Sequence, residues 1–211
     1  MLNHQEQPAK SGNTKQLVII LHGWGADGAN LIDIARPWGV AMPDAHFWAP
    51  NAPHVCEANP FGFQWFSLLD RSPAQMLAGA IDAAEHVNGL IDTKLAETGA
   101  EQLALVGFSQ GTMTALHVGL RREDVVCILG YSGALLDSPS MAEDITNKPP
   151  VCLIHGEEDD VVPFAAMGHA EQSLQACDIT IQTHARPNLP HSIDMEGVEI
   201  GGQFLMEKLT G

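Results

Sequence analysis

A serine between two glycines is the residue of this chain best placed for covalent chemistry. The segment 107–111 reads Gly-Phe-Ser-Gln-Gly, directly after the apolar run 103–106 and before a helix-like stretch at 112–118. Where a strand turns sharply into a helix, the residue in the turn is held in a strained conformation beside the helix N-terminus. The spacing therefore predicts that Ser109 is a nucleophile. The alternative is an ordinary strand-to-helix turn with an incidental serine.

A serine nucleophile needs a histidine as base and a carboxylate that orients that histidine. In strand–turn–helix hydrolases the order along the chain is serine, acid, histidine, so the partners should follow Ser109. The apolar run 151–154 leads into four consecutive acidic residues at 157–160. Neighbouring carboxylates repel one another, so a catalytic one needs hydrogen bonds or the others must turn outward. The residues alone leave Asp159 and Asp160 open. A solvated acidic turn and a calcium loop, whose EF-hand spacing is absent, are the competing interpretations.

Three of the histidines after Ser109, at 169, 184 and 191, are candidates for the base. His191 lies in the loop 187–192, between the last predicted strand and the last predicted helix, and such a loop can reach back over the sheet edge. We expect His191 to be the base. His184, close to a strand end, is the alternative, whereas His169 lies in a helical segment.

Two backbone N–H groups must stabilise the oxyanion that forms when serine attacks a carbonyl. Gln110, directly after the serine, supplies one of them. The other comes from a loop after an early strand, and the buried run 17–21 leads into the glycine-rich segment 22–28. Glycines let backbone amides approach a ligand closely, and we expect the Trp24 N–H to be the second donor.

The composition is that of a globular enzyme. The 211 residues are 45% hydrophobic and 17% charged, and the net charge of -16 includes only 10 lysines and arginines. This charge disfavours binding to nucleic acid and to anionic membranes. No run is long enough to insert stably in a bilayer. We predict a flexible tail over residues 1–15, with room for an edge strand, and a single domain over 16–211.

Location is predicted from the N-terminus and the cysteines. The polar segment 1–16 lacks the apolar region of a signal peptide. Four cysteines are scattered at 56, 127, 152 and 177 without a Cys-x-x-Cys pair, which favours buried free thiols over disulfides or a metal site. A cytoplasmic location is expected.

Apolar runs alternate with stretches of helical spacing along the chain. This order predicts a doubly wound, mostly parallel sheet with helices on both faces, an α/β fold whose ligand site lies beyond the C-terminal strand ends. The predicted strands are 17–21, 46–49, 102–106, 125–129, 151–154 and 179–183. The predicted helices are 30–38, 73–98 with Ser72 as N-cap and Gly99 as its stop, 112–120, 164–176 and 192–209. A long aromatic loop is predicted at 51–70.

Taken together, the motifs resemble the phospholipase/carboxylesterase family of α/β-hydrolases, which includes acyl-protein thioesterases and small bacterial carboxylesterases. The matching segments follow the family's order over about residues 16–209: 22–28 (His-Gly-Trp-Gly-Ala-Asp-Gly), 65–66 (Trp-Phe), 107–111, 131–133 (Tyr-Ser-Gly), 155–163 and 190–192 (Pro-His-Ser). The resemblance implies an α/β-hydrolase fold, and the short, proline-rich segment 134–150 predicts that it has no large cap domain. It also implies a triad of Ser109, Asp159 and His191, with the Trp24 and Gln110 amides as the oxyanion hole. Asp159 is selected because the family's aspartate stands four residues before a proline.

The chain departs from the family's pattern at two positions. Better-known members have a small aliphatic residue where Trp24 stands, and an aspartate where Ser67 follows the Trp-Phe pair. The Trp24 ring beside the oxyanion hole is expected to shape the acyl pocket. Ser132 is a rival serine, but its Tyr-Ser-Gly context lacks an elbow.

The predicted activity is that of a serine carboxylesterase acting on small to medium acyl esters through an acyl-enzyme. No metal or organic cofactor is expected, and His22 and His155 are interpreted as structural turn histidines. The acyl groove is expected to be lined by Trp65, Phe66, Leu68, Val161, Val162 and Leu189. Acyl-protein thioesterase and lysophospholipase are alternatives, and an amidase or a non-catalytic binding protein is a further one. The expected partner is a small acyl ester, and because some relatives form dimers, a homodimer is an open alternative.

Overall fold

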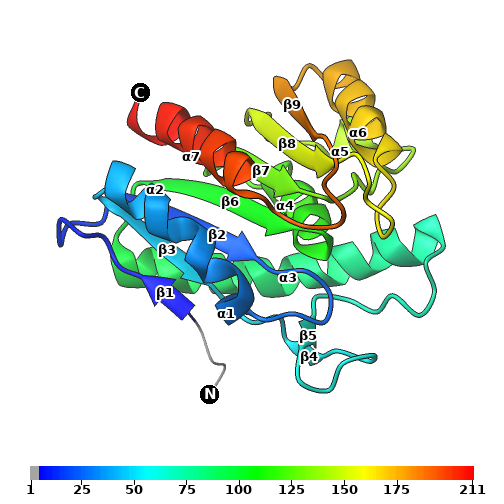
Figure 1. Cartoon of the computed structure of the whole chain (residues 1–211), viewed down its shortest axis with the longest axis horizontal. Coiled ribbons are helices and arrows are strands. Elements are labelled where there is room, and N and C mark those ends of the chain that lie inside the picture. The colour runs from blue at the N-terminus through cyan, green and yellow to red at the C-terminus, as the bar shows by residue number, and fades with distance from the viewer. Residues whose placement is uncertain (1–4) are drawn as a thin grey trace.

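A twisted central sheet with helices on both faces forms the protein (Figure 1). The computed structural model describes residues 5–211. The sheet has seven strands in the order β1-β3-β2-β6-β7-β8-β9. Every neighbouring pair is parallel except β1 with β3. The strands are β1 (Gln5–Gln7), β2 (Gln16–Leu21), β3 (Ala45–Ala49), β6 (Gln102–Phe108), β7 (Val125–Tyr131), β8 (Val151–Gly156) and β9 (Ile181–Arg186).

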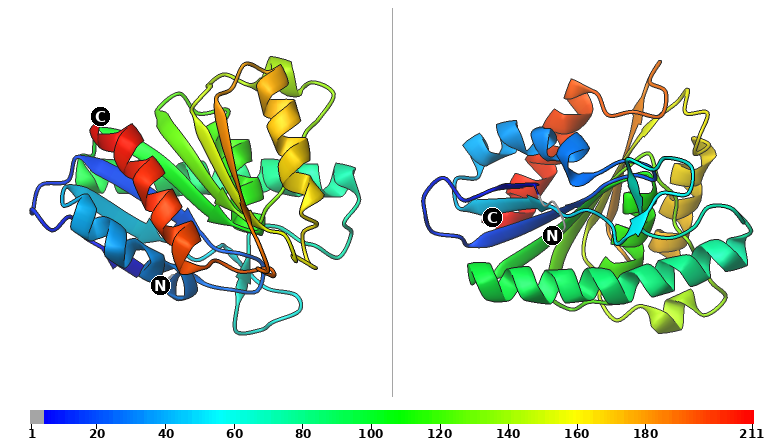
Figure 2. Two further views of the ribbon diagram at one scale, coloured as in Figure 1. Left: turned by 45° about the horizontal axis from the view of Figure 1, so that its top comes forward. Right: turned by 90° about the horizontal axis from the view of Figure 1, so that it is seen from below.

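Helices cover both faces, as the two further views show (Figure 2). The helical segments are α1 (Gly28–Leu31), the 3-10 turn η1 (Ile32–Ile34), α2 (Ala35–Ala41), α3 (Pro73–Thr98), α4 (Gln110–Gly119), α5 (Met141–Asp144), α6 (Ala165–Ala176) and α7 (Met195–Thr210). One hydrophobic core joins the sheet to α3, α4 and α6, and the other joins it to α2 and α7. Alternate residues of β2 point to the two cores, which explains its unbroken apolar run.

The predicted doubly wound sheet is confirmed, and most elements lie close to their predicted positions. Helix α3 begins after Ser72 and ends at Gly99, whose φ of 68° is the left-handed conformation that terminates helices. Within the predicted tail, β1 pairs with β3, so the edge strand is present, while residues 1–4 lie outside the described part of the chain. Helix α7 begins later than predicted because the Asp194 side chain, rather than Ser192, caps it by accepting a hydrogen bond from the Gly197 N–H.

Three short segments differ from the sequence prediction. The helix predicted over 30–38 is divided into α1, η1 and α2, because Pro37 has no N–H and its ring clashes with the carbonyl four residues earlier. The predicted loop 51–70 contains a small antiparallel ribbon of β4 (His54–Val55) and β5 (Phe63–Gln64). The four-residue helix α5 was not predicted.

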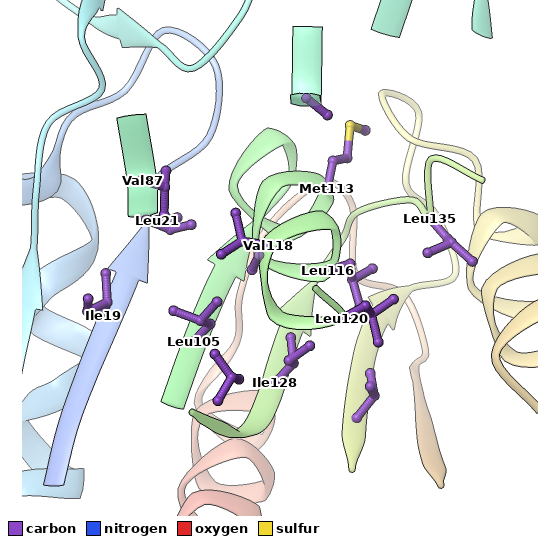
Figure 3. Packing of buried hydrophobic residues seen from close by; sticks show 14 of the residues in the cluster. Ile19, Leu21, Val87, Leu105, Met113, Leu116, Val118, Leu120, Ile128 and Leu135 are labelled. Atoms are coloured by element: carbon purple, nitrogen blue, oxygen red, sulfur yellow. The ribbon is translucent and has the colours of Figure 1, made fainter. Parts of the chain in front are cut away.

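Helix α4 is buried along its whole length between the sheet and α3. Its apolar side chains pack against β6 and β7, as the positions of Leu116, Leu105 and Ile128 show (Figure 3). Glycine permits this approach at Gly111, where a Cβ atom would overlap the Leu21 carbonyl oxygen, and at Gly107, where it would overlap the Gly111 backbone. The elbow therefore requires glycine on both sides of Ser109.

Replacing Gly111 with alanine should destabilise the fold, because the backbone of β2 cannot move away without disturbing the sheet. We expect Gly111→Ala to lower the free energy of unfolding by about 2 kcal/mol or more, measured by urea denaturation. Gly168→Ala in α6 is the matched control, since its Cβ would meet no atom within 4 Å. That variant should be stabilised by about 0.5–1 kcal/mol through helix propensity. Equal stability of the two variants would contradict the explanation.

A second prediction concerns His117, a buried residue of α4. Burial of its ring, with a smaller effect of Arg121, lowers the pKa of His117 from 6.5 to about 4. The unfolded chain therefore takes up a proton at a higher pH than the folded chain does, and stability is lost as the pH falls from 6.5 towards 4. At about pH 4.5 this residue should cost about 2 kcal/mol of folding free energy.

Urea denaturation at neutral pH and at about pH 4.5 measures this loss. His117→Gln should lose less stability between the two conditions than the wild type. His54→Gln, at an exposed position, should keep the wild-type difference. An unchanged difference in His117→Gln would overturn the assignment.

Candidate active site

Ser109 occupies the turn between β6 and α4 with a strained backbone. Its φ of 55° and ψ of -117° lie outside the regions that side-chain-bearing residues usually adopt. The turn is held from both sides: the Ser109 N–H donates to the Tyr131 carbonyl (2.9 Å), and its carbonyl accepts from Thr112 (3.0 Å) and Met113 (3.2 Å). This is the geometry of a nucleophile elbow.

The Ser109 side chain opens into a cavity at the C-terminal edge of the sheet. The cavity has a volume of about 410 Å³, and its wall also includes His191 and is mostly apolar. The remaining lining residues are Gly23, Trp24, Ala26, Leu68, Arg71, Met76, Phe108, Gln110, Met113, Ala134, Val161, Val162, Pro163 and Ala166. The position beyond the strand ends is the one the topology predicts for a ligand.

His191 and Asp159 are joined directly. The His191 Nδ1 lies 2.7 Å from Asp159 Oδ2. The other carboxylate oxygen accepts hydrogen bonds from the backbone N–H groups of Val161 (2.9 Å) and Val162 (2.8 Å). Burial of the Asp159 carboxyl opposes its ionisation, but these hydrogen bonds outweigh burial and hold its pKa below 3.8. Asp159 is therefore ionised at neutral pH and accepts the Nδ1 hydrogen, which leaves Nε2 as the free ring nitrogen.

The structure separates Asp159 from the rest of the acidic run. Its side chain is buried, whereas Glu157, Glu158 and Asp160 are exposed. The neighbouring carboxylates are thus turned outward, which limits their repulsion of a buried carboxylate. The alternative histidines lie elsewhere: His184 pairs within the sheet beside Ile154, and His169 bonds to Asp137 (2.9 Å). Neither lines the cavity.

Backbone hydrogen bonds join the loop that carries His191 to the loop that carries Asp159. The Glu158 N–H donates to the Leu189 carbonyl (3.1 Å), and the Glu157 N–H to the Arg186 carbonyl (3.0 Å). Gly156 permits the contact, because a Cβ there would overlap the Leu189 carbonyl. Arg186 and Asp194, at the two ends of the His191 loop, form an ion pair of 2.9 Å that closes it.

The two predicted oxyanion donors both lie at the cavity wall. Within residues 5–211, neither the Trp24 nor the Gln110 backbone N–H donates a hydrogen bond. The Gln110 side chain is engaged instead: its Oε1 accepts from the Trp65 N–H (3.0 Å) and its Nε2 donates to the Phe66 carbonyl (2.8 Å). The backbone donor is thus left available while the side chain is fixed.

The structure divides the predicted groove residues into two groups. Leu68, Val161 and Val162 line the cavity. Trp65 and Phe66 are buried in the core beneath it, and Leu189 lies outside its wall. The wall instead includes Arg71, Met76 and Met113, among others that the sequence analysis did not select. The only sequence signal for Arg71 and Met76 was that they follow the aromatic loop 51–70 closely. No sequence pattern gives the direction in which such side chains point.

Trp24 is held by a chain of polar contacts that reaches a second segment of the cavity wall. Its Nε1 donates to Gln64 Oε1 (2.9 Å), and the Gln64 Nε2 donates to Glu57 (3.1 Å). Glu57 also accepts from the Ser67 hydroxyl (2.8 Å) and from the Leu68 N–H (2.8 Å). Ser67 thus takes part in fixing the segment that carries Leu68 against the cavity.

His22 and His155 contact backbone groups of the loops around the site through their ring nitrogens. His22 Nε2 accepts from the Ala52 N–H (3.0 Å), so its Nδ1 carries the hydrogen and donates to the Gly23 carbonyl (2.8 Å). Burial lowers the pKa of His22 and keeps this ring neutral. His155 Nε2 lies 2.9 Å from the Val162 carbonyl and 3.1 Å from Asp159 Oδ2, both acceptors. No group of three or more metal-ligating side chains occurs in the described part of the chain.

The structure also describes the cysteines, the rival serine Ser132 and the length of the helices. All four cysteines are free; three are buried and Cys177 is half-buried. Ser132, the rival serine, is buried at the end of β7 and does not line the cavity. No helix within residues 5–211 is long and apolar enough to cross a membrane.

Comparison with known proteins identifies the family and the fold. The family model described as phospholipase/carboxylesterase matches residues 2–209. The crystal structure of esterase PE8 superposes with a TM-score of 0.93 and 40% identity, over 98% of this chain and 99% of its own. Acyl-protein thioesterase 1 of Gibberella zeae is 27% identical over 96% of this chain and 94% of its own. Esterase YpfH of Escherichia coli is 27% identical over 92% and 82%.

The parallel sheet and the elbow define an α/β-hydrolase without a large cap domain. The chain belongs to the phospholipase/carboxylesterase family and is a carboxylic ester hydrolase. The predicted resemblance is thereby confirmed.

The Arg186–Asp194 ion pair should determine how rigidly the His191 loop is held. Loss of this charge-assisted contact leaves the loop free to open, so Arg186→Gln should raise amide hydrogen exchange in residues 187–194 by about tenfold or more. Arg36→Gln removes the same charge from an exposed pair with Asp33 and is the control. Mass-spectrometric hydrogen exchange measures both variants. Unchanged exchange in Arg186→Gln would show that the ion pair does not close the loop.

Proposed function

We propose that the protein is a serine carboxylesterase whose catalytic triad is Ser109, Asp159 and His191. The observation that carries the proposal is the hydrogen bond from His191 to the buried, ionised Asp159, at the wall of the cavity that Ser109 enters. No hydrogen bond joins Ser109 to His191 among the described residues, and in unliganded hydrolases this contact commonly tightens when substrate binds. Relatives named carboxylesterase and esterase support the activity.

The proposed mechanism follows from these positions. Ser109 Oγ attacks the acyl carbonyl carbon while His191 Nε2 takes the hydroxyl proton. The Trp24 and Gln110 N–H groups stabilise the oxyanion. When the intermediate collapses, the bond to the alcohol oxygen breaks and His191 returns the proton to that oxygen. Water then attacks the acyl-enzyme with His191 again as base, the bond between the acyl carbon and Ser109 Oγ breaks, His191 returns the proton to Oγ, and the free acid leaves. The mechanism uses no metal ion or organic cofactor.

The cavity supports a preference for small to medium acyl groups. Its volume of about 410 Å³ is in the range of small-ligand sites, and Leu68, Met76, Met113 and Val162 supply apolar surface. Thioesters follow the same tetrahedral route, and relatives named acyl-protein thioesterase favour them as the second candidate. Lysophospholipids have the same type of scissile bond, and one relative is named lysophospholipase-like protein. An amidase would need stronger protonation of its leaving group.

The remaining predictions concern the location, the domain organisation and the oligomeric state of the protein. We propose a cytoplasmic location, which the free cysteines support. A single domain over 16–211 and a homodimer stay predictions. A size-exclusion measurement with light scattering tests the second.

Hydrolysis of 4-nitrophenyl esters from acetate to palmitate tests the proposed function. Ser109→Ala should lower kcat by about 10³-fold or more, because the nucleophile is lost. Wild-type activity should peak at short to medium chains and fall towards palmitate. Ser132→Ala is the matched control, since it removes another buried serine that also has positive φ. An active Ser109→Ala protein, or loss of activity in Ser132→Ala alone, would overturn the triad.

A further inference from the structure

One side chain of the cavity wall carries a permanent charge and has no part in the proposed mechanism. Arg71 lies directly before Ser72, the N-cap of α3, and lines the same cavity as Ser109 and His191. The other lining residues are apolar or neutral, apart from the titratable ring of His191, and no aspartate or glutamate lines the cavity.

Arg71 is exceptional among the cations of this chain. The sequence holds 10 lysines and arginines against 26 aspartates and glutamates. Within residues 5–211, eight of these cations pair with a carboxylate: Lys15, Arg36, Lys94, Arg121, Arg122, Lys148, Arg186 and Lys208. Only Lys10 and Arg71 form no ion pair or hydrogen bond within that range, and Lys10 does not line the cavity.

The nearest carboxylate in the sequence does not neutralise Arg71. Asp70 accepts a hydrogen bond from the Ser72 N–H (2.8 Å) and lines a different hollow. Hydrogen bonds from the Ser72 backbone and hydroxyl keep the pKa of Asp70 below 3.8, and this ionised carboxylate contacts the start of α3 and forms no ion pair with Arg71. The N-terminal end of a 26-residue helix adds a partial positive charge beside Arg71.

We propose that Arg71 binds an anionic group, a carboxylate or phosphate, on the substrate at a distance from its scissile ester. This inference rests on the proposed function, because it specifies the substrate of the same site. A guanidinium presents paired N–H donors that match the two oxygens of such a group. A chain of net charge -16 repels anions in general, so an exposed, unpaired cation at the wall of an apolar cavity is a local exception that selects where an anion binds.

The substrate class is therefore an ester with a separate anionic group on its acyl or its alcohol portion. Half-esters of dicarboxylic acids represent the first arrangement, and acyl esters of hydroxybenzoates represent the second. Two matched substrate pairs distinguish them. The first pair is mono-4-nitrophenyl adipate and its neutral methyl ester. The second is 4-butanoyloxybenzoate and its neutral methyl ester.

The test compares kcat/KM for each pair in the wild type, Arg71→Gln, Arg71→Lys and Lys10→Gln. For one of the pairs, Arg71→Gln should lower the anionic-to-neutral ratio by about tenfold or more, as expected when a charge-assisted contact is lost. Arg71→Lys should retain part of the ratio. Lys10→Gln removes the same charge outside the cavity and should leave the ratio unchanged. Inhibition of neutral-ester hydrolysis by benzoate and by phenyl phosphate shows which oxyanion Arg71 prefers.

The outcomes separate this inference from the proposed function. An anionic-to-neutral ratio that is the same in the wild type and Arg71→Gln for both pairs would overturn the role of Arg71. If Ser109→Ala still abolished hydrolysis, the triad would stand in that case. Loss of the ratio in Lys10→Gln as well would show a general charge effect and would also overturn the inference. Persistent hydrolysis in Ser109→Ala would instead refute the proposed function.

Discussion

The close approach of α4 to the strands β2 and β6 is the constraint on which the site depends. A serine can stand at a strand tip with positive φ only if the following helix starts at once and packs directly on the sheet. Gly107 and Gly111 permit that packing, since a Cβ at either position would overlap backbone atoms. Because α4 is buried on all sides, the packing of its apolar residues stabilises the fold and offsets the strain at Ser109. The proposed nucleophile is thus positioned by the hydrophobic core rather than by polar contacts of its own side chain.

The proposed acid and base, Asp159 and His191, depend on a different kind of interaction. Asp159 is buried, and an isolated carboxylate there would be costly. Hydrogen bonds from Val161, Val162 and His191 compensate, and each comes from a segment that must be held in place. The ion pair of Arg186 with Asp194 and the backbone contacts of Leu189 hold the His191 segment. The charge of one carboxylate therefore organises two loops that leave neighbouring strands.

These two kinds of interaction explain what could be predicted from the sequence. The elbow, the strand β2 and the long helix α3 follow local rules of apolar runs, glycines and caps, and their positions were predicted closely. The division of the first helical segment before Pro37 also follows a local rule that the predicted single helix over 30–38 ignored. The wall of the cavity is harder to predict, because loop side chains take their direction from contacts distant in sequence. Trp65 and Phe66 appeared suited to a groove, yet Gln110 fixes their backbone and both rings are buried in the core.

The cavity wall combines an apolar surface with a single unpaired guanidinium, and this combination has an electrostatic consequence. Arg71 is exposed where it lines the cavity, so its selectivity depends on the paired N–H donors of the guanidinium, which match the two oxygens of an anionic group. The many carboxylates elsewhere weaken the attraction of anions to the molecule as a whole. Selectivity for an anionic substrate would then arise from the short-range contact in the cavity rather than from long-range steering. The same wall that accommodates an acyl chain can in this way distinguish a charged ester from a neutral one of equal length.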